Sequence, residues 1–341
     1  MGRRAFQLQY ESNEPYRRYC RRLGIAPEEV AGWPDVPPVP TAAFRQVLFC
    51  VETPAPPLVF RTSGTTRGRP RRGRHAVPDP NLYRASLEAA FLRHVLDGQA
   101  RWPICSLIPP FSVSGDSSLS WMVDAVLKRF GGPESIHAAG SGGFDGSAVN
   151  AFVENACDTG APVCLLATTL GAAEWVARLR AEGRSYRLPP GSRLMDTGGA
   201  KGRAGLERAQ VVEQLVERLG LEPTLVINEF GMTELLSQRY SRPASSGPPR
   251  RDEAPASVRL HAPPWLRTRA LDPNTLEPVP AGELGVLCHF DLANAGSVCA
   301  ILTEDLGRVR GDELEWVGRT PGSPPRGCSL ATARLLEAQG D

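Results

Sequence analysis

The sequence is poor in lysine, in cysteine pairs and in long apolar stretches. Only two of its 39 basic residues are lysines, Lys128 and Lys201. Its eight cysteines include no Cys-x-x-Cys pair and are too dilute to predict a disulfide scaffold. No stretch approaches the ~20 apolar residues of a membrane helix, and the N-terminus lacks the apolar core of a secretion signal. We therefore expect a cytoplasmic protein without a membrane span, in which most cysteines are small buried side chains.

The sequence also lacks an excess of charge of either sign. Its 39 basic and 37 acidic residues give a formal net charge of +2, which does not favour nucleic acid or a membrane as partner. The chain has 341 residues, 41% of them hydrophobic. Such a length and composition are typical of a globular protein with a sizeable core.

Between residues 81 and 231, short apolar runs alternate with helical patterns. The alternation predicts an α/β domain with a largely parallel sheet. The expected strands are 104–110, 162–169, 192–199 and 223–231, and the expected helices are 81–97, 118–132, 147–160, 172–183 and 206–220.

The composition changes after residue 240. A Pro/Ser/Arg-rich loop at 241–256 separates an α/β core, 1–240, from several short strand patterns at 257–320 with Pro, Asn and Gly turns between them. These patterns predict an antiparallel β subdomain. The remaining 321–341 is expected to be a C-terminal tail with one short helix.

The stretch RTSGTTRGRPRRGRH, residues 61–75, has the composition of a phosphate-binding loop. Its glycines allow tight turns, and hydroxyls stand beside exposed backbone N–H groups. No Gly-Lys-Ser/Thr follows, so the loop is not of the Walker type. An ordinary solvated turn remains the alternative. The candidate phosphate ligands are Thr62, Ser63, Gly64, Thr65 and Thr66.

A second candidate is INEFGMTELLSQ, residues 227–238, where an apolar strand ends in polar residues. Ligands of open α/β sheets bind at this edge. Phe230 could stack on a purine, Thr233 could contact a phosphate and Glu234 could bind Mg²⁺. Asn228 and Gly231 are further candidate cofactor contacts. The alternative is a strand followed by a helix-capping threonine.

Two weaker candidates follow the same logic. In MDTGGAKGR, a turn containing Gly198 and Gly199 presents Lys201, which could contact phosphate or carboxylate or be an ordinary surface lysine. Near the C-terminus, Asp305 and Arg319 flank a predicted hairpin. This aspartate could accept hydrogen bonds from a ribose diol, or both could be turn residues.

The order of these motifs resembles the adenylate-forming superfamily of acyl-CoA synthetases, peptide-synthetase adenylation domains and luciferases. It is most similar to the acyl-protein synthetase branch, the LuxE-type ligase component of bacterial fatty-acid reductase. The resemblance covers roughly residues 40–332 and depends on the ordered set of TSGTTRGRPRRGRH, LYRASL, GDSSLSWM, DTGGAKG, NEFGMTELLSQ and RGCSL.

The resemblance implies a large adenylate-forming domain with mixed, largely parallel sheets flanked by helices. It also implies that Thr62–Thr66 hold the ATP phosphates, Phe230 stacks on adenine, and Thr233 contacts the α-phosphate. Glu234 would then bind Mg²⁺, and Asp305 the ribose, with Arg319 nearby. The acyl chain would lie between the sheet and the helices that follow GDSSLSWM, a region that contains Trp121 and Met122.

The sequence departs from the superfamily in two respects. Arg67 and Arg69 stand where many relatives have Gly and, near the end of the loop, Lys. The usual C-terminal lid domain with its catalytic lysine is not expected, because only 22 residues follow Arg319 and none is a lysine. We expect Lys201 or an arginine of the 67–74 cluster to supply the positive charge. Ligation to CoA becomes the less favoured outcome.

Cys328, in RGCSL, stands where acyl-protein synthetases carry an acyl-accepting cysteine near the C-terminus. A thiolate attacks a mixed anhydride readily, and Arg326 is expected to lower the pKa of the thiol. An unreactive, packed cysteine is the alternative.

The sequence therefore predicts ATP- and Mg²⁺-dependent activation of a carboxylic acid, with a fatty acid as the favoured substrate. The acyl group would then pass to Cys328 and on to a partner such as a reductase or carrier protein. One alternative passes the acyl group to CoA, a carrier protein or an amine. Another is a non-catalytic binding subunit of a reductase complex.

Overall fold

The structure is a computed structural model that describes residues 1–53, 58–63, 72–198, 207–241, 258–319 and 325–340. The chain forms two compact units, each assembled from separate segments. The first unit comprises Met1–Ser86, Met232–Gln238 and Arg259–Asp341, and the second comprises Leu87–Gly231 and Arg239–Val258. The contiguous segments expected from the sequence, 1–240, 241–256, 257–320 and 321–341, remain a prediction.

The second unit contains the predicted parallel sheet. Its strand order is β5-β4-β8-β9-β10-β11, and all neighbours are parallel except β10 and β11. The strands are β4 (Ile104–Ser106), β5 (Ile136–His137), β8 (Cys164–Thr168), β9 (Arg193–Thr197), β10 (Val226–Phe230) and β11 (Arg239–Ser241), and a separate hairpin joins β6 (Ala139–Gly140) to β7 (Gly143–Phe144).

The helices of this unit follow the predicted pattern. They are α4 (Phe111–Ser114), α5 (Ser118–Phe130), α6 (Gly146–Thr159), α7 (Thr169–Ala181) and α8 (Arg208–Leu219), with the short η4 (Pro223–Leu225) before β10. Asp145 caps α6 by accepting hydrogen bonds from two backbone N–H groups, and Gly160 ends the helix with φ +69°, a conformation that favours glycine.

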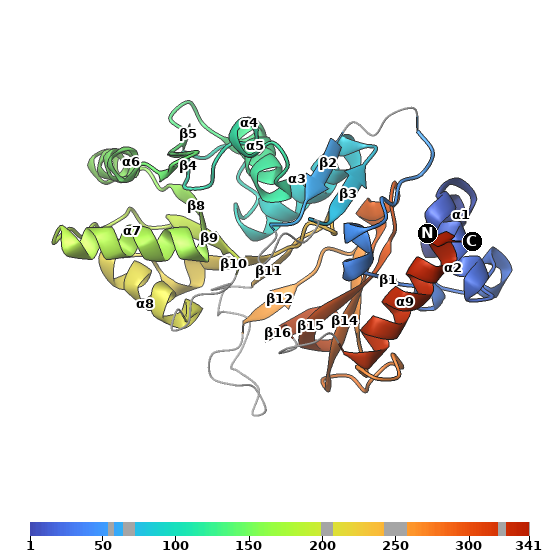
Figure 1. The fold of residues 1–341 in the computed structure, drawn as a ribbon. Coiled ribbons are helices and arrows are strands. Elements are labelled where there is room, and N and C mark those ends of the chain that lie inside the picture. The colour runs from blue at the N-terminus through green and yellow to red at the C-terminus, as the bar shows by residue number, and fades with distance from the viewer. Residues whose placement is uncertain (54–57, 64–71, 199–206, 242–257, 320–324, 341) are drawn as a thin grey trace. The chain divides into compact units, whose positions relative to one another are not determined.

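Apolar packing fixes this sheet in place. Strand β9 is buried throughout, as expected of a parallel strand that is covered on both faces. One large cluster joins β4, β8 and β9 to the apolar sides of α6, α7 and α8, and Figure 1 shows α7 and α8 beside these strands. The predicted α/β fold with a largely parallel sheet is confirmed.

The first unit contains the predicted antiparallel strands, in the order β13-β14-β15-β16-β12, with β1 parallel to β15. Strands β2 and β3 form a separate hairpin. The strands are β1 (Val39–Pro40), β2 (Leu58–Arg61), β3 (Arg74–Val77), β12 (Arg259–His261), β13 (Leu266–Leu271), β14 (Leu284–Asp291), β15 (Ala300–Arg310) and β16 (Glu313–Arg319).

The helices of the first unit bring the two ends of the chain together. The second apolar cluster joins α1, α2, β1 and the end of α9, and Figure 1 shows both termini at this place. The helices are α1 (Gly2–Ser12), α2 (Glu14–Arg22), η1 (Pro27–Glu29), η2 (Trp33–Asp35), η3 (Thr41–Arg45), η6 (Leu292–Asn294) and α9 (Arg326–Gly340), while α3 (Pro80–His94) runs from the first unit into the second.

The expectation about the cysteine side chains is met. All eight cysteines are free, and six of them are buried, so the prediction that most are small buried side chains is confirmed. Within the described ranges, no helix combines the length and the apolar character needed to cross a membrane.

Candidate active site

The structure describes only the base of the predicted phosphate loop, and hydrogen bonds close this base. Strands β2 and β3 pair with Arg61 opposite Arg74. One residue further, the Thr62 N–H donates to the Gly73 carbonyl at 3.0 Å, and the Gly73 N–H donates to Thr62 Oγ1 at 2.9 Å. Ser63 is exposed. The remaining predicted ligands, Gly64, Thr65 and Thr66, lie outside the described residues.

One arginine of the basic cluster stabilises this base. Arg72 Nε donates to the Thr62 carbonyl at 2.5 Å, and its Nη2 donates to the Arg61 carbonyl at 3.2 Å. These two bonds hold the guanidinium against the backbone where the loop begins. Residues 67–71 of the cluster, and Lys201, lie outside the described part of the chain.

His75 connects this hairpin to Thr233. A carbonyl oxygen can only accept, so His75 Nδ1 carries the proton and donates to the Thr233 carbonyl at 2.7 Å, while Nε2 accepts from the Ser297 hydroxyl at 2.8 Å. Complete burial lowers the pKa of His75 to about 4, which agrees with a neutral ring that uses both nitrogens. His75 thereby ties the end of the predicted phosphate loop to the second motif.

Buried side chains hold the segment of residues 232–238, whose backbone forms neither helix nor strand. Asn294 Nδ2 donates to the Glu234 carbonyl at 2.7 Å. The Leu236 N–H donates to Asp291 Oδ2 and Asn294 Oδ1 at 3.0 and 3.1 Å, and the Ser237 hydroxyl donates to Asp291 Oδ1 at 2.6 Å. These partners satisfy backbone groups that regular structure would otherwise satisfy.

The carboxyl group of Asp291 is fully buried, and burial raises its pKa to about 6 although three of its neighbours donate hydrogen bonds to it. Glu234 is also buried, and Thr233 is half-buried. The backbone of this segment is therefore fixed before any ligand arrives, which suits a site that must align a hydroxyl and a carboxylate.

The sequence did not predict His75, Asp291 or Asn294 as parts of the site. His75 is the last residue of the stretch 61–75, so its place in the motif was a usable signal. Asp291 and Asn294 flank the short turn DLAN after β14, where polar residues follow an apolar strand.

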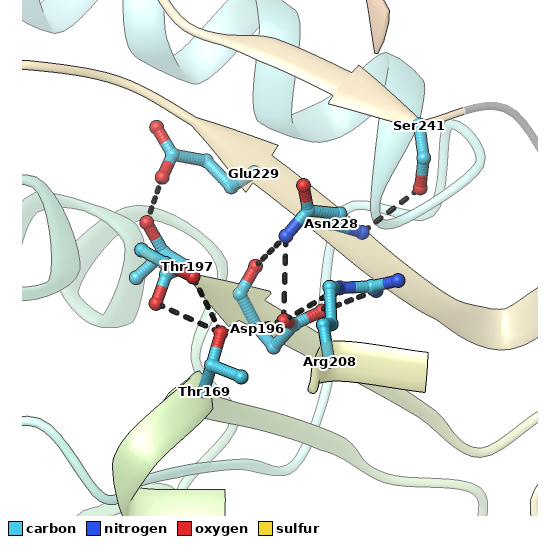
Figure 2. Close-up of polar contacts among 8 residues, drawn as sticks. Thr169, Asp196, Thr197, Arg208, Asn228, Glu229 and Ser241 are labelled. Carbon is cyan, nitrogen blue, oxygen red and sulfur yellow. Dashed lines mark hydrogen bonds and ion pairs between the residues drawn. The ribbon is translucent and has the colours of Figure 1, made fainter. Parts of the chain in front are cut away.

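In the second unit, polar side chains gather at the carboxyl ends of β9 and β10 (Figure 2). Asp196 accepts three hydrogen bonds from Arg208, at 2.5 to 3.1 Å, and Thr169 Oγ1 lies 2.9 Å from its Oδ2. The Thr197 hydroxyl contacts the Glu229 carboxylate. Asp196 is 2% exposed and Glu229 4%.

The predicted glycine turn begins in this cluster. Gly198 has φ +77°, a conformation that strains other residues, and its carbonyl accepts from the Thr169 hydroxyl at 2.5 Å. Asn228 Nδ2 lies 3.3 Å from both the carbonyl oxygen and Oδ2 of Asp196. Gly199 lies outside the described residues. The parallel pairing thus brings the DTGG and NEFG motifs together.

Phe230 ends β10 and lies on the same face as Asn228, since alternate residues of a strand share a face. Both side chains are half-buried, and Gly231 beyond them is exposed. The chain passes from the second unit to the first between Gly231 and Met232, so the motif contributes residues to both.

Asp305 and Arg319 are paired, as the predicted hairpin implied. They are register partners on β15 and β16, and Arg319 Nε lies 3.2 Å from Asp305 Oδ1. Asp305 is 6% exposed, whereas the arginine side chain is 56% exposed. Arg319 therefore reaches solvent beside a buried carboxylate.

Cys328 does not lie in an open tail. It belongs to the first turn of α9 and is 4% exposed, packed among apolar side chains that include Leu302, with Sγ 3.5 Å from the Thr303 carbonyl oxygen. The expectation that Arg326 lowers the pKa of this thiol is wrong. Burial raises it to about 11, and the nearby Glu304 adds to the shift.

Comparison with known proteins identifies the family. The model of the family described as acyl-protein synthetase, LuxE, matches residues 149–334, more than half of the chain. The chain belongs to the LuxE acyl-protein synthetase family. The resemblance drawn from the ordered motifs is thereby confirmed.

This LuxE-family chain is 23% identical to a long-chain-fatty-acid–luciferin-component ligase of Vibrio harveyi, over 99% of this chain and 87% of that protein. It is 36% identical to the protein of the same name from Aliivibrio fischeri over 88 residues, which is 23% of each chain.

Solved structures share the fold at low identity. A 2-hydroxyisobutyryl-CoA ligase with bound 2-HIB-AMP matches with a TM-score of 0.67 and 17% identity, covering 93% of this chain and 66% of that one. The ATP-bound RpMatB-BxBclM chimera B3 matches with a TM-score of 0.51 and 16% identity, covering 79% and 49%. The chain thus spans about half to two thirds of these structures. The family model thus shows a LuxE-type acyl-protein synthetase, and the solved structures show the fold that it shares with them.

Proposed function

We propose that this LuxE-family chain uses ATP and Mg²⁺ to convert a fatty acid into an acyl-adenylate and then transfers the acyl group to Cys328. In the first step a carboxylate oxygen bonds to the α-phosphorus and pyrophosphate leaves. In the second, the thiolate bonds to the acyl carbon and AMP leaves with the electron pair of the broken C–O bond.

The observation that carries this proposal is the hydrogen bond between His75 and the Thr233 carbonyl. It couples two stretches that the sequence assigns separately to phosphate binding. A displacement at phosphorus gains most from donors that are fixed before the reaction, and buried side chains fix this part of the backbone. The hydroxyls of Thr62 and Thr233 and the N–H groups of residues 63–66 would contact the phosphates.

Glu234 would hold Mg²⁺. Among the residues that the structure describes, no cluster of three or more His, Cys, Asp or Glu side chains is suited to a metal ion. Mg²⁺ in nucleotide sites needs only one or two carboxylates, since phosphate oxygens and water supply the rest. One buried glutamate with a fixed backbone therefore fits this ion, which when bound neutralises charge on the phosphates.

Residues of three motifs would hold the nucleoside. Phe230 would stack on the base beside Asn228, with Gly198 and Gly199 in the adjoining turn, and Asp305 would accept hydrogen bonds from the ribose diol. Arg319, mostly exposed beside Asp305, would contact the same nucleotide. Lys201 or an arginine of residues 67–74 other than Arg72, which donates to backbone carbonyls, would supply the remaining positive charge.

The substrate class follows from the relatives. Both curated relatives are named as ligases of long-chain fatty acids, so we propose a long-chain fatty acid as substrate. A protein such as a reductase or carrier would then take the acyl group from the enzyme.

The test uses a radiolabelled long-chain fatty acid with ATP and Mg²⁺. We expect fatty-acid-dependent ATP–pyrophosphate exchange and a protein-bound label that hydroxylamine releases. Cys328→Ser should keep the exchange and lose the label, whereas Cys164→Ser, at a fully buried cysteine of β8, should keep both. Without exchange in the wild type, the activation step is wrong; equal labelling of Cys328→Ser refutes the thioester.

The burial of Cys328, which is 4% exposed, favours a second candidate, direct transfer from the adenylate to CoA, a carrier protein or an amine. Acyl-CoA formation at the wild-type rate by Cys328→Ser would support this candidate.

A further inference from the structure

A cavity lies between helices α6 and α7 of the second unit, which Figure 1 shows next to each other. Its volume is about 500 Å³. It is lined by one face of α6, with Asn150 and Glu154, and by Trp175, Arg178 and Glu182 on or just after α7. None of these residues belongs to the candidate active site, so the cavity is a separate feature of the molecule.

Asn150 is the buried polar side chain of this cavity. It is 8% exposed, and its Oδ1 accepts a hydrogen bond from Trp175 Nε1 at 3.1 Å. An indole nitrogen can only donate, so the amide oxygen faces Trp175 and the NH₂ group points the other way. Among the described residues, no atom accepts a hydrogen bond from this NH₂ group. Because buried polar groups normally have a partner, the amide is suited to an acceptor that enters the cavity.

Arg178 adds a second donor near the start of α6. Its guanidinium carbon lies 4.6 Å from the centre of the Phe144 ring, and its Nη2 donates to Glu174 at 2.8 Å. Its Nη1 lies beside Gly146, because a Cβ atom added to this glycine would stand 3.5 Å from it. Gly146 and Asn150 are about one turn apart on α6. The two donors therefore lie along the same part of the cavity, where they suit a carboxylate.

One turn of α6 beyond Asn150, two carboxylates share one guanidinium. Arg184 Nη1 donates to Glu154 Oε1 at 3.2 Å, and Arg184 Nε lies 3.4 Å from Glu182 Oε2. The Tyr186 hydroxyl donates to the same Glu154 oxygen at 3.0 Å. Both bonds to Glu154 reach Oε1, which leaves Oε2 to accept from a ligand. Two carboxylates and one guanidinium carry a net negative charge, which suits an ammonium group.

The charges of the cavity select one class of ligand. The charged residues that line it are Asp145, Glu154, Glu182, Arg178 and Arg184. An anion alone would meet a net negative surface, and an amine alone would leave the NH₂ group of Asn150 without an acceptor. A zwitterion satisfies both ends. Side chains four residues apart on a helix have Cβ atoms about 5–6 Å apart, a distance that an α-amino acid spans with a hydrogen bond of about 2.9 Å at each end.

We propose that the cavity between α6 and α7 binds a free α-amino acid. Its carboxylate accepts hydrogen bonds from Asn150 and Arg178, and its ammonium group donates to Glu154 and Glu182. Because Asp145 already accepts from two N–H groups of α6, its charge is offset at the carboxylate end. The site shares no residue with the nucleotide site, so the amino acid is expected to bind without ATP.

The test measures the Tm of the full-length protein with each proteinogenic amino acid at millimolar concentration and without ATP. At least one should raise the Tm, because a ligand that binds only the folded state stabilises it. The Kd of the amino acid with the largest shift is then measured by isothermal titration calorimetry. Its N-acetyl derivative lacks the ammonium group and its decarboxylated amine lacks the carboxylate, so each should bind at least about tenfold more weakly.

Three variants locate the binding. Asn150→Asp keeps the oxygen that accepts from Trp175 but replaces the NH₂ group with a carboxylate oxygen, so it should raise the Kd at least about tenfold. Asn155→Asp is the matched control, because it makes the same change at an exposed position of α6 outside the cavity, and its Kd should stay within about twofold. Glu154→Gln keeps an acceptor for Arg184 but removes the charge, and it should also raise the Kd at least about tenfold.

Any of four results would overturn the proposal. The first is a Tm that no amino acid changes, and the second is an N-acetyl derivative that binds as tightly as the free amino acid. The third is an unchanged Kd in Glu154→Gln, which applies even where Asn150→Asp does not fold. The fourth is an equal loss of affinity in Asn150→Asp and Asn155→Asp, because added charge anywhere on α6 would then explain the effect.

Discussion

The position of Cys328 predicts that its thiol reacts only when the first turn of α9 opens. In the closed state the Gly327 N–H donates to the Pro273 carbonyl at 2.9 Å. A Cβ atom added to Gly327 would stand 2.8 Å from that oxygen and 2.8 Å from Cγ and Cδ2 of Leu276. Leu276 itself is held at φ +62°, so it has little freedom to move aside. Gly327→Ala should therefore favour the open state.

The magnitude follows from the cost of overpacking. Inserting a methyl group into a closely packed contact costs about 1–3 kcal/mol. Gly327 is the second residue of α9, so the advantage of about 1 kcal/mol that alanine has over glycine in a helix interior does not apply in full at this position. An opening free energy lowered by this amount raises the open population by about 5-fold to about 150-fold. The alkylation rate of Cys328 should rise by the same factor.

The assay is alkylation by iodoacetamide, with each cysteine peptide quantified by mass spectrometry over time. Gly340→Ala is the control, because a Cβ atom at the other end of α9 meets no atom within 4 Å. Burial raises the pKa of the Cys328 thiol to about 11 in the closed state, whereas the usual pKa of 9.0 applies in the open state. The open state therefore loses the proton first as the pH rises. Opening becomes more favourable from about pH 9 to about pH 11. Equal alkylation of wild type and Gly327→Ala would refute the reasoning, as would a wild-type Cys328 that reacts as fast as an exposed cysteine.

Three further outcomes are expected. Because the pKa of His75 is lowered to about 4 in the folded state, the unfolded state binds a proton first as the pH falls. Urea unfolding should therefore show a free energy of unfolding about 2 kcal/mol lower at pH 5 than at pH 7. A His75→Gln variant with the same loss would contradict this prediction. Glu234→Gln should raise the Mg²⁺ concentration needed for half-maximal ATP–pyrophosphate exchange about tenfold, because one charged ligand contributes about 1.4 kcal/mol or more. An unchanged Mg²⁺ dependence would show that Glu234 does not bind the ion. Asp305→Asn should narrow the preference for ATP over 2′,3′-dideoxy-ATP about tenfold, measured as a ratio of Kd values; a preserved ratio would show that Asp305 does not contact the ribose.

The sequence predicted the elements whose signal is local. The apolar run PVCLLATT predicted β8, and the apolar residues just before Asn228 predicted β10. Both predictions were possible because a buried strand needs several apolar residues in a row. The family could be inferred from motif order alone. The expected hairpin was found with Asp305 and Arg319 in register, since a turn pairs the residues on either side of it.

Contacts between distant segments could not be predicted in this way. His75 and Thr233 are 158 positions apart, and no local pattern shows that one is the partner of the other. The burial of Cys328 did have a signal, because Cys328, Ala331, Leu335 and Ala338, which are all buried, recur at helical spacing. A tail with such an apolar stripe is expected to pack as a helix.

The two ends of α9 are held differently, which bears on how the thiol could be released. Near its C-terminal end, Gln339 Nε2 donates to the Pro15 carbonyl at 2.9 Å and Glu337 pairs with Arg22 at 3.0 Å. At its start, the Gly327 N–H donates to the Pro273 carbonyl, and Cys328 packs on β15.

Opening of the first turn alone would therefore expose Cys328 while the contacts of α9 with α2 persist. Weakening the distal end should then have little effect on the thiol. Gln339→Ala is expected to alkylate at Cys328 within about twofold of the wild type, since the hydrogen bond it removes is outside the opening unit. If Gln339→Ala instead raised the rate as much as Gly327→Ala, α9 would leave as a whole, and the acyl acceptor would be carried on a moving helix rather than uncovered in place.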